Sequence, residues 1–219
     1  MLIFSVWSLR LFGIAGIAGA IIFILGDLLY NHVPGSKDSP TVKMSRLPLP
    51  RLLNAATLGL VGCWLYVLGA LHVFIAFSPA GETFAFVVLL AFGAVMVGYG
   101  ISHTAYFAIA SGAQVAAGAG SDAETGGKPG NALFQRLVYI IYVPTALASL
   151  MMLYAVVTGK SMYPVWAVVF QPIVIYLLKT PVTRLLRGRA MELVRDCYDN
   201  LALLVFYLLS TIVLWNGIT

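Results

Sequence analysis

The chain has 219 residues, of which 61% are hydrophobic and only 10% are charged, and its mean hydropathy is +0.95. This balance excludes a soluble enzyme, because it lies far outside the composition of water-soluble domains. At about 20 residues per span, the length accommodates roughly six or seven transmembrane helices in one polytopic membrane domain over residues 1–219. The formal net charge of +5 comes from residues between apolar runs, which indicates topology determinants and headgroup contacts, and no nucleic-acid partner.

Six apolar runs predict six transmembrane helices. They cover about residues 2–30, 52–77, 84–110, 133–157, 163–178 and 201–215. Pro144 and Pro172 lie inside the fourth and fifth runs and predict a kink in each, because proline removes a backbone hydrogen bond. From Thr183 to Tyr198, basic and apolar residues alternate as in a short interfacial amphipathic helix before the last span. The expected fold class is an all-α integral membrane protein.

The stretch over 111–131 is rich in glycine and nearly free of large apolar side chains. Such a segment cannot bury enough apolar surface to become ordered. We therefore expect a flexible loop over about 111–131.

The distribution of Lys and Arg predicts the orientation in the membrane. Eleven of the 13 lie in or beside the connections after the first, third and fifth helices, and only Arg10 and Lys160 lie on the opposite side. Because cytoplasmic loops carry the excess of basic residues, the rule places those connections in the cytoplasm and both termini outside. The expected location is a bacterial-type inner (plasma) membrane.

Asp27 and His103 are the candidate catalytic residues, because ionisable groups inside a span are costly and need partners or water. Small residues share the face of Asp27, so its carboxylate is expected to point into the bundle. Tyr99 and Tyr106 share one stripe with His103. By helical rise, Asp27 and His103 differ in depth by roughly 7 Å, which allows direct or water-mediated contact.

Further polar residues of the same cytoplasmic half are candidate ligand-binding groups. They are Tyr30, Asn54, Tyr99, Tyr106, Arg136, Tyr139 and Asn200. Arg136 and the basic stretch over 184–195 are expected to contact a headgroup phosphate. Purely structural alternatives stand beside this hypothesis: Arg136 as a snorkelling residue, Asp27 as a helix cap and His103 bonded to a tyrosine or carbonyl.

Metal, haem and disulfide chemistry are not favoured by the spacing. His72 falls near the outer end of its helix and His103 in the inner half of the next, so they are out of register for a shared haem. His32 falls in a connection, which leaves too few ligands for zinc or di-iron. Cys63 and Cys197 fall at different depths, so both are expected to be reduced. No metal and no cofactor are predicted.

Two short segments resemble known signatures. They are GDLLY, from Gly26 to Tyr30, and HTAYF, from His103 to Phe107. Together they resemble two signatures of the lysoplasmalogenase family, polytopic membrane enzymes that cleave the vinyl ether of ether lysolipids. In that family the segments lie closer together, whereas a further helical hairpin separates them here. The resemblance is confined to these segments and implies Asp27 and His103 as functional positions.

The leading hypothesis is a pocket in the cytoplasmic leaflet that binds an amphipathic lipid-like ligand and could modify it by acid/base chemistry. Asp27 would act as base or acid, with His103 as its partner. One alternative is a proton-coupled small-solute transporter or channel, with helices hinging around Gln171. Another is a non-catalytic subunit of a membrane complex. The expected partners are membrane lipids and the ligand, with a homo-oligomer or a membrane subunit as further candidates.

Overall fold

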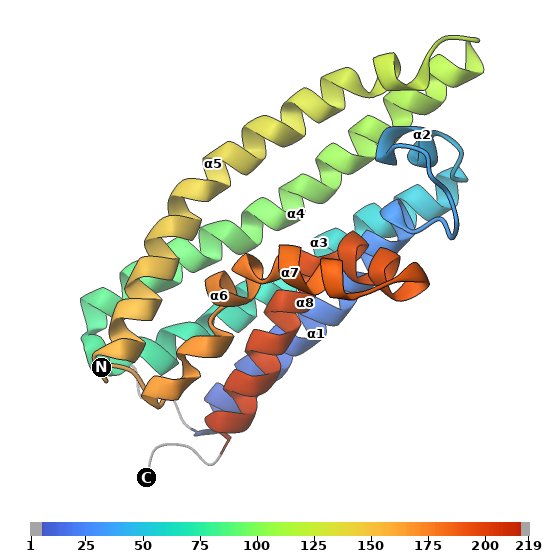
Figure 1. Ribbon diagram of the computed structural model, residues 1–219. Coiled ribbons are helices and arrows are strands. Elements are labelled where there is room, and N and C mark those ends of the chain that lie inside the picture. Colours follow the sequence, from blue (N-terminus) through green and yellow to red (C-terminus); the bar gives the residue numbers. More distant parts are fainter. Residues whose placement is uncertain (1–5, 216–219) are drawn as a thin grey trace.

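The computed structural model describes residues 6–215, and these form a bundle of helices with no strand among them (Figure 1). This confirms the all-α expectation. Five helices are long and apolar enough to cross a membrane. They are α1 (Val6–Asn31), α3 (Leu49–Phe77), α4 (Glu82–Gly118), α5 (Ala123–Val157) and α8 (Gly188–Val213).

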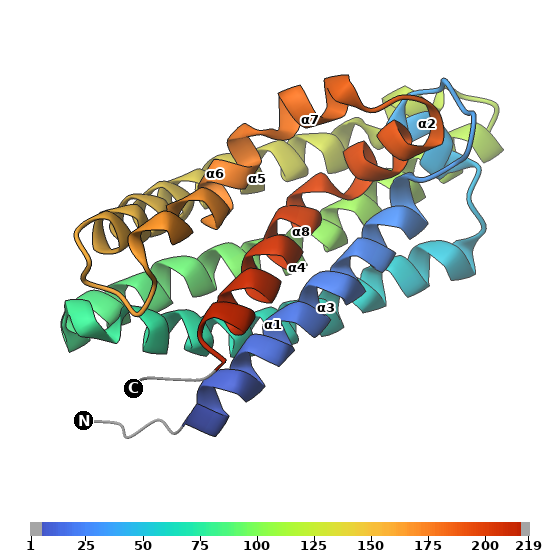
Figure 2. The same ribbon diagram turned by 60° about the horizontal axis from the view of Figure 1, so that its bottom comes forward.

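Short helices fill the connections. They are α2 (Pro40–Ser45), the 3-10 helices η1 (Ser78–Ala80) and η2 (Val165–Phe170), α6 (Pro172–Leu177) and α7 (Lys179–Leu185). Figure 2 shows that α6 and α7 carry the chain back along the bundle from the end of α5 to the start of α8. The start of α1 lies beside the residues that follow α8, where Arg10 donates from Nε to the carbonyl of Trp215 at 2.8 Å.

The expected continuous helix over 163–178 is wrong: within residues 6–215, this segment is divided into two short helices beside the five long ones. Gln171 separates η2 from α6 in an extended conformation (φ −61°, ψ 141°). Pro172 explains the break, because its ring disfavours the helical conformation of the preceding residue and it has no N–H to donate. Pro144, in contrast, lies inside the continuous helix α5.

The expected loop over 111–131 is also wrong, because α4 runs to Gly118 and α5 starts at Ala123. Its glycines serve close helix packing. A Cβ on Gly112 would collide with the carbonyl oxygen of Gly126, and a Cβ on Gly130 would lie 2.5 Å from the backbone nitrogen of Ile109. Small residues thus replace large apolar ones as the means of burial in this hairpin.

The interfacial helix expected over 183–198 is divided between two elements. Its first residues end α7, the chain is extended at Leu186 and Arg187, and α8 then begins at Gly188. Within α8, Cys197 has a non-helical conformation (φ −135°, ψ 20°), so the basic first turns are kinked away from the apolar remainder. Cys197 and Cys63 are both buried and unbonded to each other, as expected.

Candidate functional site

A cavity of about 1050 Å³ lies among α1, α4, α5, α6 and α8, beside the connector that contains α2. Its inner wall combines aromatic and aliphatic side chains with a small polar group. The apolar part includes Phe23, Tyr106, Phe134, Ile141 and Ile173, and the polar part Asp27, His103 and Asn200. An apolar cavity with a few convergent polar groups is the usual form of a small-molecule site.

Asp27 is the centre of a buried hydrogen-bond network. Its Oδ1 lies 3.2 Å from Nε2 of His103, and its Oδ2 accepts a hydrogen bond from Nδ2 of Asn200 at 2.6 Å. Tyr66 in turn donates to Oδ1 of Asn200 at 2.8 Å. Four helices, α1, α3, α4 and α8, therefore each contribute one side chain, and the expected meeting of Asp27 and His103 occurs directly.

Close packing fixes the imidazole of His103, which is 4% exposed. A Cβ on Gly59 would lie 2.5 Å from its Cγ and Nδ1, so only glycine leaves room for the ring there. Phe23 packs edge-on against the ring at 4.8 Å between centroids. The hydroxyl of Tyr30 donates to the backbone carbonyl of His103 at 3.1 Å. The ring therefore has no room to reorient.

The two ring nitrogens of His103 have different surroundings. Nδ1 is buried with no partner among residues 6–215, whereas Nε2 faces the carboxylate of Asp27. Asp27 accepts one hydrogen bond, from Asn200, and its 8% exposure leaves it facing the cavity. This arrangement suits a general base that is oriented by its neighbours.

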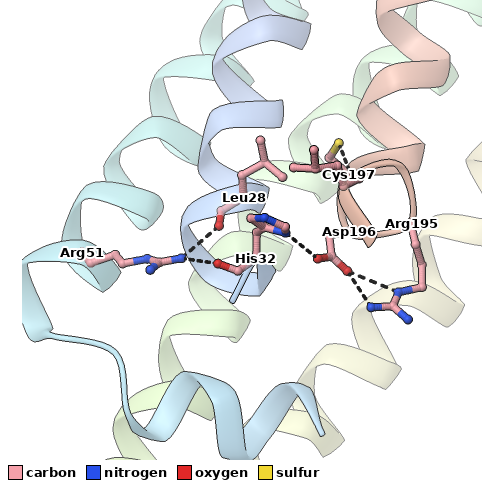
Figure 3. Close-up of polar contacts among 7 residues, drawn as sticks. Leu28, His32, Arg51, Arg195, Asp196 and Cys197 are labelled. Atoms are coloured by element: carbon pink, nitrogen blue, oxygen red, sulfur yellow. Dashed lines mark hydrogen bonds and ion pairs between the residues drawn. The ribbon is translucent and has the colours of Figure 1, made fainter. Parts of the chain in front are cut away.

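The charged rim of the cavity is tied to the end of α1 (Figure 3). Arg51 of α3 donates to the carbonyls of Leu28, Leu29 and His32 at 3.2, 2.7 and 2.7 Å, which satisfies the last turn of that helix. His32 lies 3.4 Å from Asp196, next to the kink in α8. The rim is thus held by contacts between segments far apart in sequence.

The predicted ligand-binding residues fall into three groups. Tyr99, Tyr106 and Asn200 line the cavity. Tyr30 lies behind it, against His103. Asn54, Arg136 and Tyr139 are not brought to the cavity: their side chains are exposed outside its lining, and Tyr139, for example, is 69% exposed.

Two tyrosine hydroxyls in the site were not predicted from the sequence. Tyr66 holds Asn200, and the hydroxyl of Tyr176 lies 2.8 Å from that of Tyr99. Both tyrosines fall in apolar runs, and the general tendency of a buried tyrosine hydroxyl to find a partner is the one signal that marks them. Within residues 6–215, no three His, Cys, Asp or Glu side chains gather as a metal site would require.

A second buried polar cluster lies toward the other end of α3. Nδ1 of His72 lies 2.9 Å from the carbonyl oxygen of Leu9, and Nε2 lies 2.6 Å from Oγ of Ser210. The hydroxyl of Tyr163 lies 2.6 Å from the same Oγ. His72 and Ser210 are fully buried, and neither lines the large cavity.

Comparison with known proteins places the chain in a family. A family model described as "Family of unknown function (DUF6796)" matches residues 6–216. Since the match covers nearly the whole chain, the protein belongs to this family. No curated protein and no solved structure matches it significantly. The resemblance to lysoplasmalogenases therefore stays a prediction.

Proposed function

We propose that this member of the DUF6796 family is an integral membrane protein that binds an amphipathic lipid-like molecule in its cavity and transfers a proton to or from it through Asp27. The observation that carries the proposal is the contact of Asp27 with His103 and Asn200 inside a cavity of about 1050 Å³. Outward-facing apolar side chains on the long helices support residence in a bilayer, as does the burial of the ionisable pair.

The mixed lining favours an amphipathic ligand. Charged side chains from the connector, α7 and the start of α8 line one part, and Phe134, Ile141 and Ile173 line another. A polar head would rest among the charges while a hydrocarbon chain covers the apolar wall. The Lys and Arg distribution places this charged part in the cytoplasmic leaflet, with both termini outside.

Asp27 is the proton acceptor in the proposed reaction. His103 and Asn200 hold its two oxygens, so the remaining lone pairs can face a ligand group in the cavity. Burial removes competing water, which strengthens these contacts. His103 orients the carboxylate through the 3.2 Å contact of its Nε2 with Oδ1 of Asp27.

The test compares the wild-type chain with Asp27→Asn. Each is purified in a neutral detergent, its bound amphiphiles are identified by native mass spectrometry, and its products are followed after incubation with a total membrane lipid extract. We expect both proteins to retain a bound amphiphile and Asp27→Asn to lose turnover by about 100-fold or more, the usual contribution of a general base.

Glu82→Gln provides the control, because Glu82 is exposed at the start of α4, away from the cavity. It should behave like the wild type in both measurements. Equal turnover by Asp27→Asn and the wild type would exclude Asp27 as the base. A wild-type chain that retains no amphiphile would exclude the ligand class.

A proton-coupled carrier is a second candidate, favoured by the divided segment over 163–178. Gln171 is extended between η2 and α6, and the adjoining Ile173 and Tyr176 line the cavity. Interrupted helices beside a central site are typical of secondary transporters. Solute uptake into proteoliposomes that follows an imposed pH gradient and is abolished by Asp27→Asn would favour this function over lipid modification.

A further inference from the structure

Lys43 is a buried cation beside the cavity. It lies on α2, lines the cavity and is 9% exposed. Its neighbours Thr41 and Met44 are buried too, so this short helix is packed into the protein. The side chain of Lys43 is mostly covered, while its ammonium group is not among the fully buried polar atoms and so remains accessible at the cavity. A partly desolvated ammonium group without a counter-charge is costly. The surroundings of Lys43 therefore decide whether the cavity calls for an anion.

The other charges near Lys43 are largely neutralised by each other. The ion pairs are Lys179–Asp199 at 2.9 Å, Arg195–Asp196 at 3.3 Å and Arg46–Asp38 at 2.7 Å. Across the described part of the chain, the ammonium group of Lys43 has no such partner, and neither does that of the exposed Lys37. Two carboxylates of the lining lie outside these three pairs, the half-buried Glu192 and Asp27, which contacts His103. The lining as a whole therefore has no excess of positive charge, and the case for an anion rests on Lys43 itself, whose ammonium group has no carboxylate partner among the described residues.

Contacts with the α4–α5 hairpin hold α2, and Lys43 with it, in place. Ser39 caps α2 by accepting from the N–H of Val42, and its hydroxyl also donates to Glu124 of α5. Asn131 of α5 donates to the hydroxyl of Thr41 at 3.3 Å. The backbone that carries Lys43 is therefore preorganised, which lowers the cost of binding a ligand there.

We propose that Lys43 binds the phosphate group of the amphipathic ligand. This inference rests on the proposed function of the cavity and adds the chemistry of the head group. A lysine ammonium is a common partner of phosphate and forms charge-assisted hydrogen bonds with it. The phosphate lies at Lys43, the adjoining part of the ligand reaches Asp27, and the hydrocarbon chain covers Phe134 and Ile141. Lys43 thereby takes the role that the sequence predicted for Arg136.

The experiment measures head-group preference by native mass spectrometry of the full chain released from neutral-detergent micelles. The chain is titrated with an alkyl phosphate, an alkyl phosphocholine and an alkyl maltoside of equal chain length. We expect the two phosphate-bearing amphiphiles to bind the wild type about tenfold more tightly than the maltoside, and Lys43→Met to remove this preference. Lys43→Arg should retain it.

Lys128→Met is the matched control, because Lys128 is an exposed cation at the start of α5 outside the cavity lining. It should leave the preference unchanged. Equal affinities of the wild type for all three amphiphiles would overturn the role of Lys43 and leave the proposed function standing. Binding of none of them would overturn both. Inorganic phosphate that binds as tightly as the alkyl phosphate would show a site for the free ion, against the proposal.

Thermal unfolding without added amphiphile gives an independent measurement. Replacing an unpaired buried charge by an apolar side chain of similar length removes its desolvation cost. Lys43→Met should therefore unfold at a higher temperature than the wild type when no phosphate amphiphile is present, and the order should reverse when alkyl phosphate is added. The same order with and without alkyl phosphate would contradict the proposal. If Lys43→Met fails to fold, the preferences of the wild type and Lys43→Arg still decide it.

Discussion

The two buried histidines of the bundle differ in what surrounds them. Both ring nitrogens of His72 have protein partners, Leu9 and Ser210. His103 has one partner, the carboxylate of Asp27, and its other nitrogen has none among residues 6–215. His103 and Asp27 line a large cavity, whereas His72 does not.

This difference separates a polar cluster that stabilises the fold from one that is suited to a ligand. In the first, every contact is made within the protein, so removing a member leaves unpaired groups behind. In the second, the carboxylate of Asp27 faces the cavity and remains available to a ligand. Burial of a histidine in an apolar helix is thus not by itself a sign of function. A neighbouring charged group together with an accessible cavity is a better indication.

The largest predicted effect is the loss of stability in His72→Ala. The truncation leaves a void and an unpaired carbonyl on Leu9, and it removes one of the two partners of Ser210, which keeps Tyr163. We therefore expect the free energy of unfolding in a detergent titration to fall by about 3–5 kcal/mol. His103→Ala should cost about 1–3 kcal/mol, because it removes one polar contact, with Asp27, beside an existing cavity. We expect His103→Ala to change the amount of bound amphiphile and His72→Ala to leave it unchanged. Equal losses of stability would erase the distinction between the clusters.

The sequence predicts Asp27 and His103 well because helical spacing determines which residues share a face. Small residues before Asp27 direct it inward, and helical rise places His103 near its depth. The roles of Lys43 and Tyr66 follow from tertiary contacts, which spacing alone does not fix. Asn54 and Arg136 lie outside the cavity lining for the same reason. Their depth along the helices was predictable from the sequence, but the side of each helix that faces the cavity was not.

The main errors about the fold also have a physical cause. Glycine was interpreted as a source of flexibility over 111–131, yet Gly112 and Gly126 allow two backbones to approach closely. A single sequence contains no information about which partner a small residue meets. The error at Pro172 is of the opposite kind. Hydrophobicity indicated one continuous span, but Pro172 restricts the backbone of Gln171 to an extended conformation and so divides the segment into two helices.

A pair of tyrosine variants sharpens the comparison with a smaller effect. Tyr66→Phe removes the donor to Asn200 and should lower the free energy of unfolding by about 1 kcal/mol. Tyr207 is also buried, and its hydroxyl has no partner among the described residues. Tyr207→Phe should therefore change stability by less than about 0.5 kcal/mol or increase it slightly. Equal effects in detergent unfolding titrations would show that the hydrogen bond to Asn200 contributes nothing.

The smallest effect is expected at an exposed carboxylate, which serves as a reference for the buried one. Asp122 caps α5, and hydrogen bonds from the side chain and N–H of Thr125 hold its pKa below the usual value for an aspartate. Because the folded-state pKa is depressed, its contribution is present above the unfolded-state pKa and is lost as pH falls through the lower folded value.

Asp122→Ala should speed hydrogen exchange at the amides of Glu124 and Thr125 near neutral pH. The midpoint of global unfolding should stay unchanged, because the cap lies at an exposed helix end. Unchanged exchange at both amides would show that the cap is not formed in solution.

The contact of Gly112 with Gly126 has a consequence for the whole DUF6796 family. It sets the separation of α4 and α5 at the point where Glu124 and Asn131 of α5 hold α2. A relative with a bulkier side chain at either position must splay this hairpin and displace α2. Under the proposed function, the distance between these two backbones therefore influences how large a head group the cavity accepts, and substitutions at Gly112 or Gly126 change it without contacting the bound molecule.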